Sequence, residues 1–429
     1  MSGSIRTGLG GDDPQPNASM AHASRLRGAR DDADGCRKVR REATVKTAGG
    51  GRGLIAAIIG VVGVSVPAVA SAAPAAPEVT TTTTATTATT VTAAPSASVA
   101  VTDTRVLVRG SASGGVREVR LERLVGRTWR TIDTAVASAD GSFALTLPTG
   151  TPGVSRYRVH APASGTDGAG TSRAFTVGVG DGDPRAVSYL TTPAVRWDPC
   201  TPIGYRVNLS GAPDGALDDV RRAVSQVSVA TGVNFRYLGT TTVVPGSTST
   251  DVPDAYPADT RLVVAYTTPA KSKYFGRGTD LLGVGGVFYD LTPVKVGRSS
   301  WHRALQGYVV LDSGRDLPGG FGAGSPEGLL GTWGQVLLHE LGHSVGLDHP
   351  PTADKAQIMY PETTYKQARW GAGDLVGLRR LGAASGCFPA AKDAQGSAAR
   401  NRVDPSLALP AHPSGTVART RVTEKPRGR

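Results

Sequence analysis

A single thirty-residue stretch, TWGQVLLHELGHSVGLDHPPTADKAQIMYP, constrains this chain more than any other part of it. His339 and His343 are four residues apart, so a helix places their side chains one above the other on the same face. Glu340 stands beside them, and Gly346 allows the positive φ with which a chain leaves a helix sharply. His349 can then return toward the first two histidines. Three neutral imidazoles around an open fourth position are the ligand set of a catalytic zinc.

The spacing of these residues is specific. A His-Glu-x-x-His pattern alone arises by chance in roughly one chain of this length in a hundred. Requiring the glycine and the third histidine lowers that frequency to about one in a hundred thousand. We therefore prefer a zinc site to a core helix with incidental histidines. Of the seven histidines in the chain, we expect the isolated His160 to be a surface strand residue and His302 an exposed or core residue.

The pattern H-E-x-x-H-x-x-G-x-x-H, with Ile-Met-Tyr-Pro downstream, resembles the metzincin zinc peptidases. The resemblance implies that the metal is bound by three ligands, namely His339, His343 and His349. It also implies that Glu340 is the general base and that Met359 is the methionine of the turn beneath the zinc.

Within that clan, the Leu-Asp pair before His349 and the Met-Tyr-Pro sequence look most like the matrixins. Pro350 departs from the matrixin pattern, which has Ser there, and is similar to the serralysins instead. Pro361 occupies the position at which astacins and serralysins place a zinc-binding tyrosine, so no tyrosine ligand is expected. The sequence leaves open whether calcium ions (Ca2+) also bind.

The resemblance covers residues 186–390 and implies an α+β zincin fold with a mixed five-stranded sheet and an active-site helix. The apolar patterns in this range agree with such a strand and helix series. The expected strands are Ile203–Asn208, Val233–Leu238, Leu262–Thr267, Val284–Tyr289 and Tyr308–Asp312. The expected helices are Asp214–Ala230, an active-site helix from near Leu329 to Val345, and Asp374–Leu381.

The segment Gly283–Asp290, GVGGVFYD, is expected to be the edge strand above the zinc. By the resemblance, a polypeptide substrate binds in extended form along residues 284–289 through main-chain hydrogen bonds. The glycines suit the close approach of another backbone, although a merely kinked edge strand would also contain them.

Residues 98–180 are predicted to form an immunoglobulin-like β-sandwich. Short runs alternate apolar and polar residues with a period of two, as in Phe143/Leu145/Leu147, and Asp140-Gly141 and Pro152-Gly153 provide turns. About seven strands in roughly 80 residues are typical of a small sandwich. The sequence does not identify the cell-surface or matrix ligand of such a module.

Residues 1–72 are expected to contain a secretion signal. Leu54–Val66 is an apolar run without charges, and it is shorter than the ~20 residues that span a bilayer. Ala70-Ser71-Ala72 offers a cleavage site before Ala73. The mature protein would then be extracellular and without a membrane span, whereas an uncleaved signal would hold it at the cell surface. Residues 73–97, rich in Thr, Ala and Pro, are expected to be a linker.

The formal net charge of +12 by itself suggests a nucleic-acid partner, so the place of the charge along the chain matters. Residues 1–52 carry a net +4 and residues 391–429 a net +5, which leaves +3 for everything between them. No basic stripe with interleaved aromatic residues is visible, so no nucleic-acid partner is expected. Residues 391–429 are predicted to be a disordered basic tail.

Three cysteines are available. Cys36 lies in the segment expected to be removed, which leaves Cys200 and Cys387 at the two ends of the zincin range. In an oxidising compartment a disulfide between them would close a long loop. The alternative is that Cys200 caps the zinc of a latent enzyme, but the residues around it lack the matrixin pattern.

Together these features predict a secreted zinc-dependent endopeptidase. Zinc (Zn2+, one catalytic ion) would acidify a water, and Glu340 would take its proton and deliver it to the leaving amine. One alternative is an extracellular binding or adhesion protein with a metal-loaded but inactive or latent zincin domain. Another is a zinc hydrolase that acts on a non-peptide amide.

Overall fold

The computed structural model describes residues 87–249, 252–276, 281–325 and 331–389, and the backbone of 417–419 and 422–424. The expected signal segment, its cleavage site before Ala73 and the cysteine at position 36 lie outside the described residues. Among the helices that are described, none combines the length and the apolar character that a bilayer crossing needs.

The first described part of the chain is all β. A three-stranded antiparallel sheet contains β1 (Val91–Pro95), β3 (Val106–Ala112) and β6 (Ser142–Leu147). A second sheet contains β2 (Val99–Val101), β9 (Phe175–Gly180), β7 (Gly153–Ala161), β4 (Glu118–Val125) and β5 (Thr128–Val136), with β8 (Gly170–Thr171) beside β7. Alternate residues of both sheets, such as Val108 and Leu145 in one and Leu121 and Val159 in the other, share one buried core.

This all-β part begins earlier than the sequence predicts. Strand β1 lies inside the range 73–97 that was expected to be a linker, because Val91 is buried in the core and Thr92 hydrogen-bonds Ser111 on β3. A segment from the Thr/Ala/Pro-rich range therefore forms a strand where a neighbouring strand supplies hydrogen bonds and an apolar face. His160 is half-buried on β7, and its Nδ1 lies 3.2 Å from the hydroxyl of Thr171 on β8.

The second part is an α/β unit built on a mixed sheet. Five strands lie in the order β13 (Phe235–Thr240), β12 (Ile203–Asn208), β14 (Leu262–Thr267), β17 (Ser299–Asp312) and β15 (Gly283–Asp290). The first four are parallel to one another, and β15 runs antiparallel to β17. The five expected strands are thus present, with β17 longer than predicted. Two short strands, β11 (Val195–Arg196) and β16 (Val294–Val296), also pair with β17.

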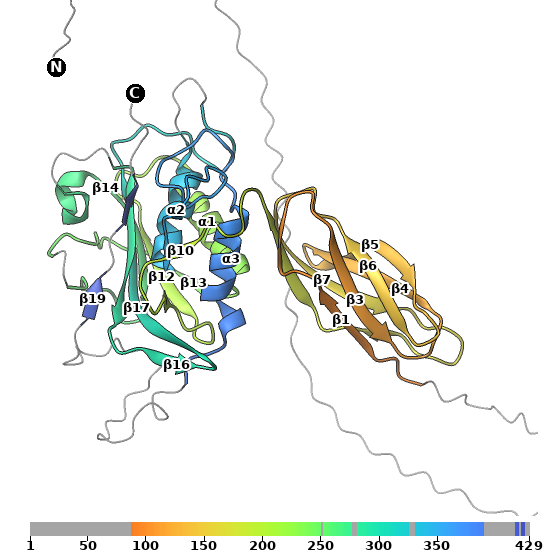
Figure 1. The fold of residues 1–429 in the computed structure, drawn as a ribbon. Helices are drawn as coiled ribbons and strands as arrows, with labels where there is room; N and C mark the ends of the chain where they lie inside the picture. The colour runs from red at the N-terminus through yellow and green to blue at the C-terminus, as the bar shows by residue number, and fades with distance from the viewer. Residues whose placement is uncertain are drawn as a thin grey trace, which may run out of the picture. The chain divides into compact units, whose positions relative to one another are not determined.

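Three α-helices accompany this sheet: α1 (Ala216–Thr231), α2 (Trp333–Ser344) and α3 (Ala372–Leu381). Figure 1 shows α1 and α2 on the same face of the sheet, where they cover a continuous apolar core. Val264 and Val309 point into that core, whereas Val263 and Val310 belong to smaller clusters on the opposite face. The active-site helix was predicted to start near Leu329, but it begins at Trp333, because Thr332 is extended and caps it. The remaining short helices are η1 (Pro269–Lys271), η2 (Lys273–Phe275) and η3 (Ala383–Ser385).

Two short strands come from the C-terminal range that was expected to be disordered. Both β19 (Val417–Arg419) and β20 (Val422–Glu424) pair antiparallel with β15. The prediction for residues 391–429 is therefore wrong at these two places. The physical reason is that the edge of β15 presents main-chain N–H and C=O groups. An extended segment can pair with these groups whatever the segment's composition.

The disulfide between Cys200 and Cys387 is present and joins residues 187 positions apart. It ties the start of β12 to the segment after α3, so it closes nearly the whole α/β unit into one loop. Because both sulfurs are bonded to each other, the alternative in which Cys200 caps a metal as a thiolate does not apply to this structure.

Candidate metal centre

Helix α2 carries two of the three histidines and buries them completely. The Thr332 hydroxyl caps its start by accepting a hydrogen bond from the backbone N–H of Gln335 at 3.4 Å. Every residue of the helix is buried, and His339, Glu340 and His343 are each 0% exposed. A helix buried on all sides agrees with its nearly continuous apolar sequence. The helix therefore holds these polar side chains in a fixed interior position.

The chain leaves α2 through Gly346, which has a φ of 112°. A Cβ at this position would lie 2.2 Å from the carbonyl oxygen of Val195, so both the backbone angle and the space require glycine. Strand β18 (Leu347–Asp348) follows at once and pairs antiparallel with β10 (Ser188–Tyr189). This small two-stranded ladder determines where His349 stands, directly after β18.

The three histidines predicted to share a site do come together. The Nε2 atom of His339 lies 3.0 Å from Nε2 of His343 and 3.1 Å from Nε2 of His349. The ligand atoms of all three lie within 4.8 Å of one another. Together they can hold a metal ion. Among the described residues one other such group exists, Asp198 with the two bonded cysteines, and its sulfurs are already committed to the disulfide.

Hydrogen bonds at the far side of two rings decide which nitrogen carries the proton. His339 Nδ1 lies 2.7 Å from the carbonyl oxygen of Ile358, and His343 Nδ1 lies 2.9 Å from that of Leu347. A carbonyl oxygen only accepts, so each Nδ1 must donate its N–H. Both Nε2 atoms then present lone pairs toward each other. Such lone pairs repel one another unless a cation lies between them, which is the arrangement of metal-ligating histidines.

All three imidazoles favour the neutral form that binds a metal. Burial lowers the pKa of His339 to about 3, with a further contribution from the nearby His349. Burial, together with the two neighbouring histidines, also lowers the pKa of His343 well below its usual value. The pKa of the less buried His349 is lowered too, again chiefly by burial. Protons therefore compete weakly with a metal for these nitrogens near neutral pH.

Met359, which the resemblance makes the methionine of the turn beneath the zinc, lies against helix α2 at Gly342, the residue before His343. It is 2% exposed, and its sulfur would lie 2.3 Å from a Cβ placed at Gly342 in the middle of α2. The helix glycine therefore makes room for the methionine, and a side chain at position 342 would displace it.

Asp374, at the start of α3, was not singled out from the sequence. Its fully buried carboxyl accepts hydrogen bonds from the backbone N–H groups of Ile358 (2.6 Å), Gly371 (2.9 Å) and Met359 (3.3 Å). Burial raises its pKa to about 7, although those three donors act in the opposite direction. It fixes the turn whose Ile358 carbonyl orients His339. A carboxylate in the first turn of a predicted helix was the only available signal.

Glu340 directly follows His339 on α2 and packs against strand β15 of the sheet. A Cβ at Gly283 would lie 2.9 Å from both Cγ and Oε1 of Glu340, and one at Gly285 would lie 2.1 Å from its backbone oxygen. The glycines of β15 therefore allow the strand to contact α2 directly. This accounts for the GVGG sequence by close packing against the helix.

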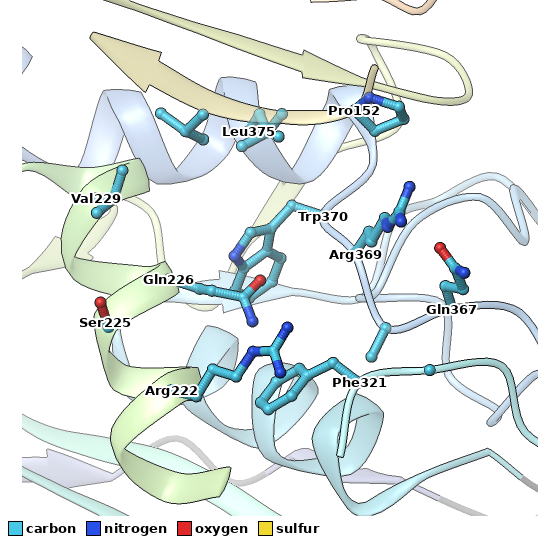
Figure 2. A pocket seen from close by; sticks show the side chains of 14 residues that line it. Pro152, Arg222, Ser225, Gln226, Val229, Phe321, Gln367, Arg369, Trp370 and Leu375 are labelled. Atoms are coloured by element: carbon cyan, nitrogen blue, oxygen red, sulfur yellow. The ribbon is translucent and has the colours of Figure 1, made fainter. Parts of the chain in front are cut away.

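The cavity in Figure 2 lies apart from these residues. It has a volume of about 550 Å³ and is lined in part by Arg222 and Gln226 of α1 and by Arg369 and Trp370 before α3. The Arg222 guanidinium stacks 4.9 Å from the centre of the Phe321 ring. Neither the three histidines nor Glu340 line this cavity. His302 is separate as well, since it is buried and its Nδ1 donates to the Asp290 carbonyl at 2.8 Å.

Comparisons with known proteins add little. No family model matches the sequence, and no curated protein matches it. A chain from a structural study of T cell specificity and activation by the bacterial superantigen toxic shock syndrome toxin-1 is 12% identical to this protein. That match covers 21% of this chain and 98% of the other, with a TM-score of 0.18, and a likeness this low supports no statement about fold or function.

Proposed function

We propose that this protein is a secreted zinc-dependent endopeptidase of the metzincin type, with an immunoglobulin-like domain before its catalytic domain. The observation that carries the proposal is that the Nε2 atoms of three histidines converge, and that a buried glutamate lies on the helix that holds two of them. Zinc bonds to histidine are about 2.0–2.1 Å long, so two ligands of a tetrahedral ion lie roughly 3.3 Å apart. The separations of 3.0 and 3.1 Å are close to that value.

The donor set favours zinc over harder ions. Calcium and magnesium prefer carboxylate, carbonyl and water oxygens, whereas the atoms that converge here are imidazole nitrogens. His339 and His343 each donate their second ring N–H to a backbone carbonyl, which is the usual support for a ligating histidine. Three protein ligands leave one position for a water or a substrate oxygen.

Glu340 is the residue to which we assign proton transfer. When bound, zinc lowers the pKa of a coordinated water and polarises a carbonyl group. Glu340 directly follows His339 on the helix, and its carboxyl lies against Gly283 of β15. From there it takes a proton from the attacking water and gives it to the nitrogen of the leaving amine. No Ser, Cys or Lys nucleophile takes part in this scheme.

The substrate that suits this site is an extended polypeptide. Strand β15 lies at the side of the five-stranded sheet next to Glu340, and its main-chain groups on the side away from β17 can pair with another extended strand. An added strand would form main-chain hydrogen bonds with β15, and its scissile carbonyl would lie near the histidines. The disulfide fits an oxidising, extracellular compartment.

The test is cleavage of a mixed peptide library by the full chain loaded with zinc. We expect endoproteolysis by the parent protein and a loss of at least about 100-fold in the Glu340→Gln variant, which removes general base catalysis but keeps the side-chain shape. Glu118→Gln, on the all-β part, is the matched control and should cleave at the parental rate. Equal rates for the parent and Glu340→Gln would reject the mechanism, and no cleavage by a zinc-loaded parent would favour the inactive binding protein.

A further inference from the structure

The substrate-binding edge proposed above is already paired with another part of the same chain. Strand β19 aligns Arg419, Ala418 and Val417 with Phe288, Tyr289 and Asp290 of β15. Strand β20 aligns Glu424, Thr423 and Val422 with Gly283, Val284 and Gly285. Both pairings are antiparallel, and together they extend over both ends of β15.

The paired segment lies beside the general base. Gly283 and Gly285 are paired in register with residues of β20. They are also the two glycines that pack against the side chain and the backbone of Glu340. Strand β20 also contacts helix α2. Neighbouring strands are about 4.8 Å apart, so the backbone of residues 422–424 runs one strand spacing from the part of β15 that packs on Glu340.

A single edge of a strand accepts a single partner at a time. The N–H and C=O groups of β15 that bond β19 and β20 are the groups that an incoming peptide strand would use. A substrate along residues 284–289 must therefore displace these C-terminal strands. We infer that strands β19 and β20 are an intramolecular competitor for the substrate-binding edge. When no substrate is present, these two strands of the same chain occupy β15.

This inference rests on the proposed function, because it assigns the occupant of the same edge. The competition should be moderate. Each of the two strands is three residues long, and short two-stranded pairings are marginal in water. The tether compensates in part, since a covalent connection raises the local concentration of these strands at β15. Removing the pairing should therefore lower KM for an extended peptide by about 3- to 10-fold and leave kcat unchanged.

The test replaces two neighbouring residues of β20 by proline, as Val422→Pro with Thr423→Pro in the full chain. Neighbouring residues of an antiparallel strand alternate in which N–H faces the partner, so the double change removes a ladder donor whichever residue supplies it. The matched control is Ala398→Pro with Ala399→Pro, which changes the same C-terminal tail outside β19 and β20.

Two measurements decide the inference. Hydrogen exchange of the β15 amides does not depend on activity, and it should become faster in the β20 variant and stay at the parental rate in the control. Steady-state cleavage should show the lower KM, and a synthetic peptide of residues 415–426 should inhibit the β20 variant competitively.

Unchanged exchange of the β15 amides, or an unchanged KM in an active enzyme, would overturn the inference and leave the proposed function standing. If no form cleaves peptides, the proposed function fails. The competition for substrate fails with it, and faster exchange in the β20 variant would then report the strand pairing alone.

Discussion

Adding one methyl group at Gly285 tests whether β15 and α2 contact each other as the structure shows. An alanine Cβ there would lie 2.1 Å from the backbone oxygen of Glu340 and 2.8 Å from its Cα and carbonyl carbon. Ordinary contacts begin at 3.4 Å, so strand and helix would have to separate by about 1.3 Å. The atoms in the way belong to the backbone of a buried helix, and no side-chain rotation relieves the overlap.

The expected cost is at the upper end of the range for overpacked cores, about 3 kcal/mol in the free energy of unfolding. For a domain of this size each kcal/mol lowers Tm by roughly 2–4 °C, so Gly285→Ala should melt about 6–12 °C below the parent. Because Glu340 is the neighbour of His339, zinc affinity should also fall, by about 10-fold or more.

The assay is calorimetric unfolding of the metal-free protein followed by titration with zinc in competition with a chelating dye. Gly322→Ala is the matched control, because a Cβ there meets nothing within 4 Å and its backbone angle needs no glycine. If Gly285→Ala and Gly322→Ala differ by less than about 0.5 kcal/mol, which is the usual size of a neutral surface change, the close contact of β15 with α2 is refuted.

Three further predictions follow from the site and its supports. Since burial lowers the pKa of His339 from 6.5 to about 3, the unfolded chain binds more protons in that window, so stability of the metal-free protein is lost as pH falls from 6.5 toward 3. Between pH 7 and pH 4 this loss amounts to about 3 kcal/mol, and urea unfolding at these two pH values should show a loss larger by that amount in the parent than in His339→Gln. Asp374 also makes stability depend on pH. Its raised pKa stabilises the folded protein at low pH, and this stabilisation is lost as pH rises toward 7. Because Asp374 is present in both proteins, its effect cancels when the parent is compared with His339→Gln. Asp374→Ala leaves three buried N–H groups without their acceptor, so it should cost about 3 kcal/mol or more, and a melting temperature equal to the parent's would contradict that role. Cys200→Ser opens a loop of 187 residues and should lower the free energy of unfolding by roughly 2–5 kcal/mol, whereas an unchanged urea midpoint would show that the bridge stabilises nothing.

The convergence of the three histidines could be predicted from the sequence because its determinants are local. The helical repeat alone places His339 and His343 on the same face, and Gly346 indicates where the helix ends. Cys200 and Cys387 could be paired because the third cysteine lies in the predicted signal segment. The main strands of the sheet were visible as apolar runs, since both of their faces are covered.

What could not be predicted depends on partners far away in the sequence. Asp374 acts on backbone groups 15 and 16 residues earlier, which no local pattern reveals. The composition of β1 resembles a linker, and it becomes a strand only because β3 lies beside it. Strands β19 and β20 have no apolar alternation of their own, and they form where the edge of β15 offers hydrogen bonds. In each case the long-range contact outweighs the local propensity.

The most direct test of the central claim is the zinc content of the folded protein, measured by native mass spectrometry on the sample that is then assayed for peptide cleavage. The proposed function predicts one zinc per chain in the parent and in Glu340→Gln, cleavage by the parent alone, and loss of both zinc and cleavage in His349→Ala. A folded parent that binds no zinc, or a His349→Ala variant that binds it as tightly as the parent, would contradict the assignment of these three histidines as its ligands.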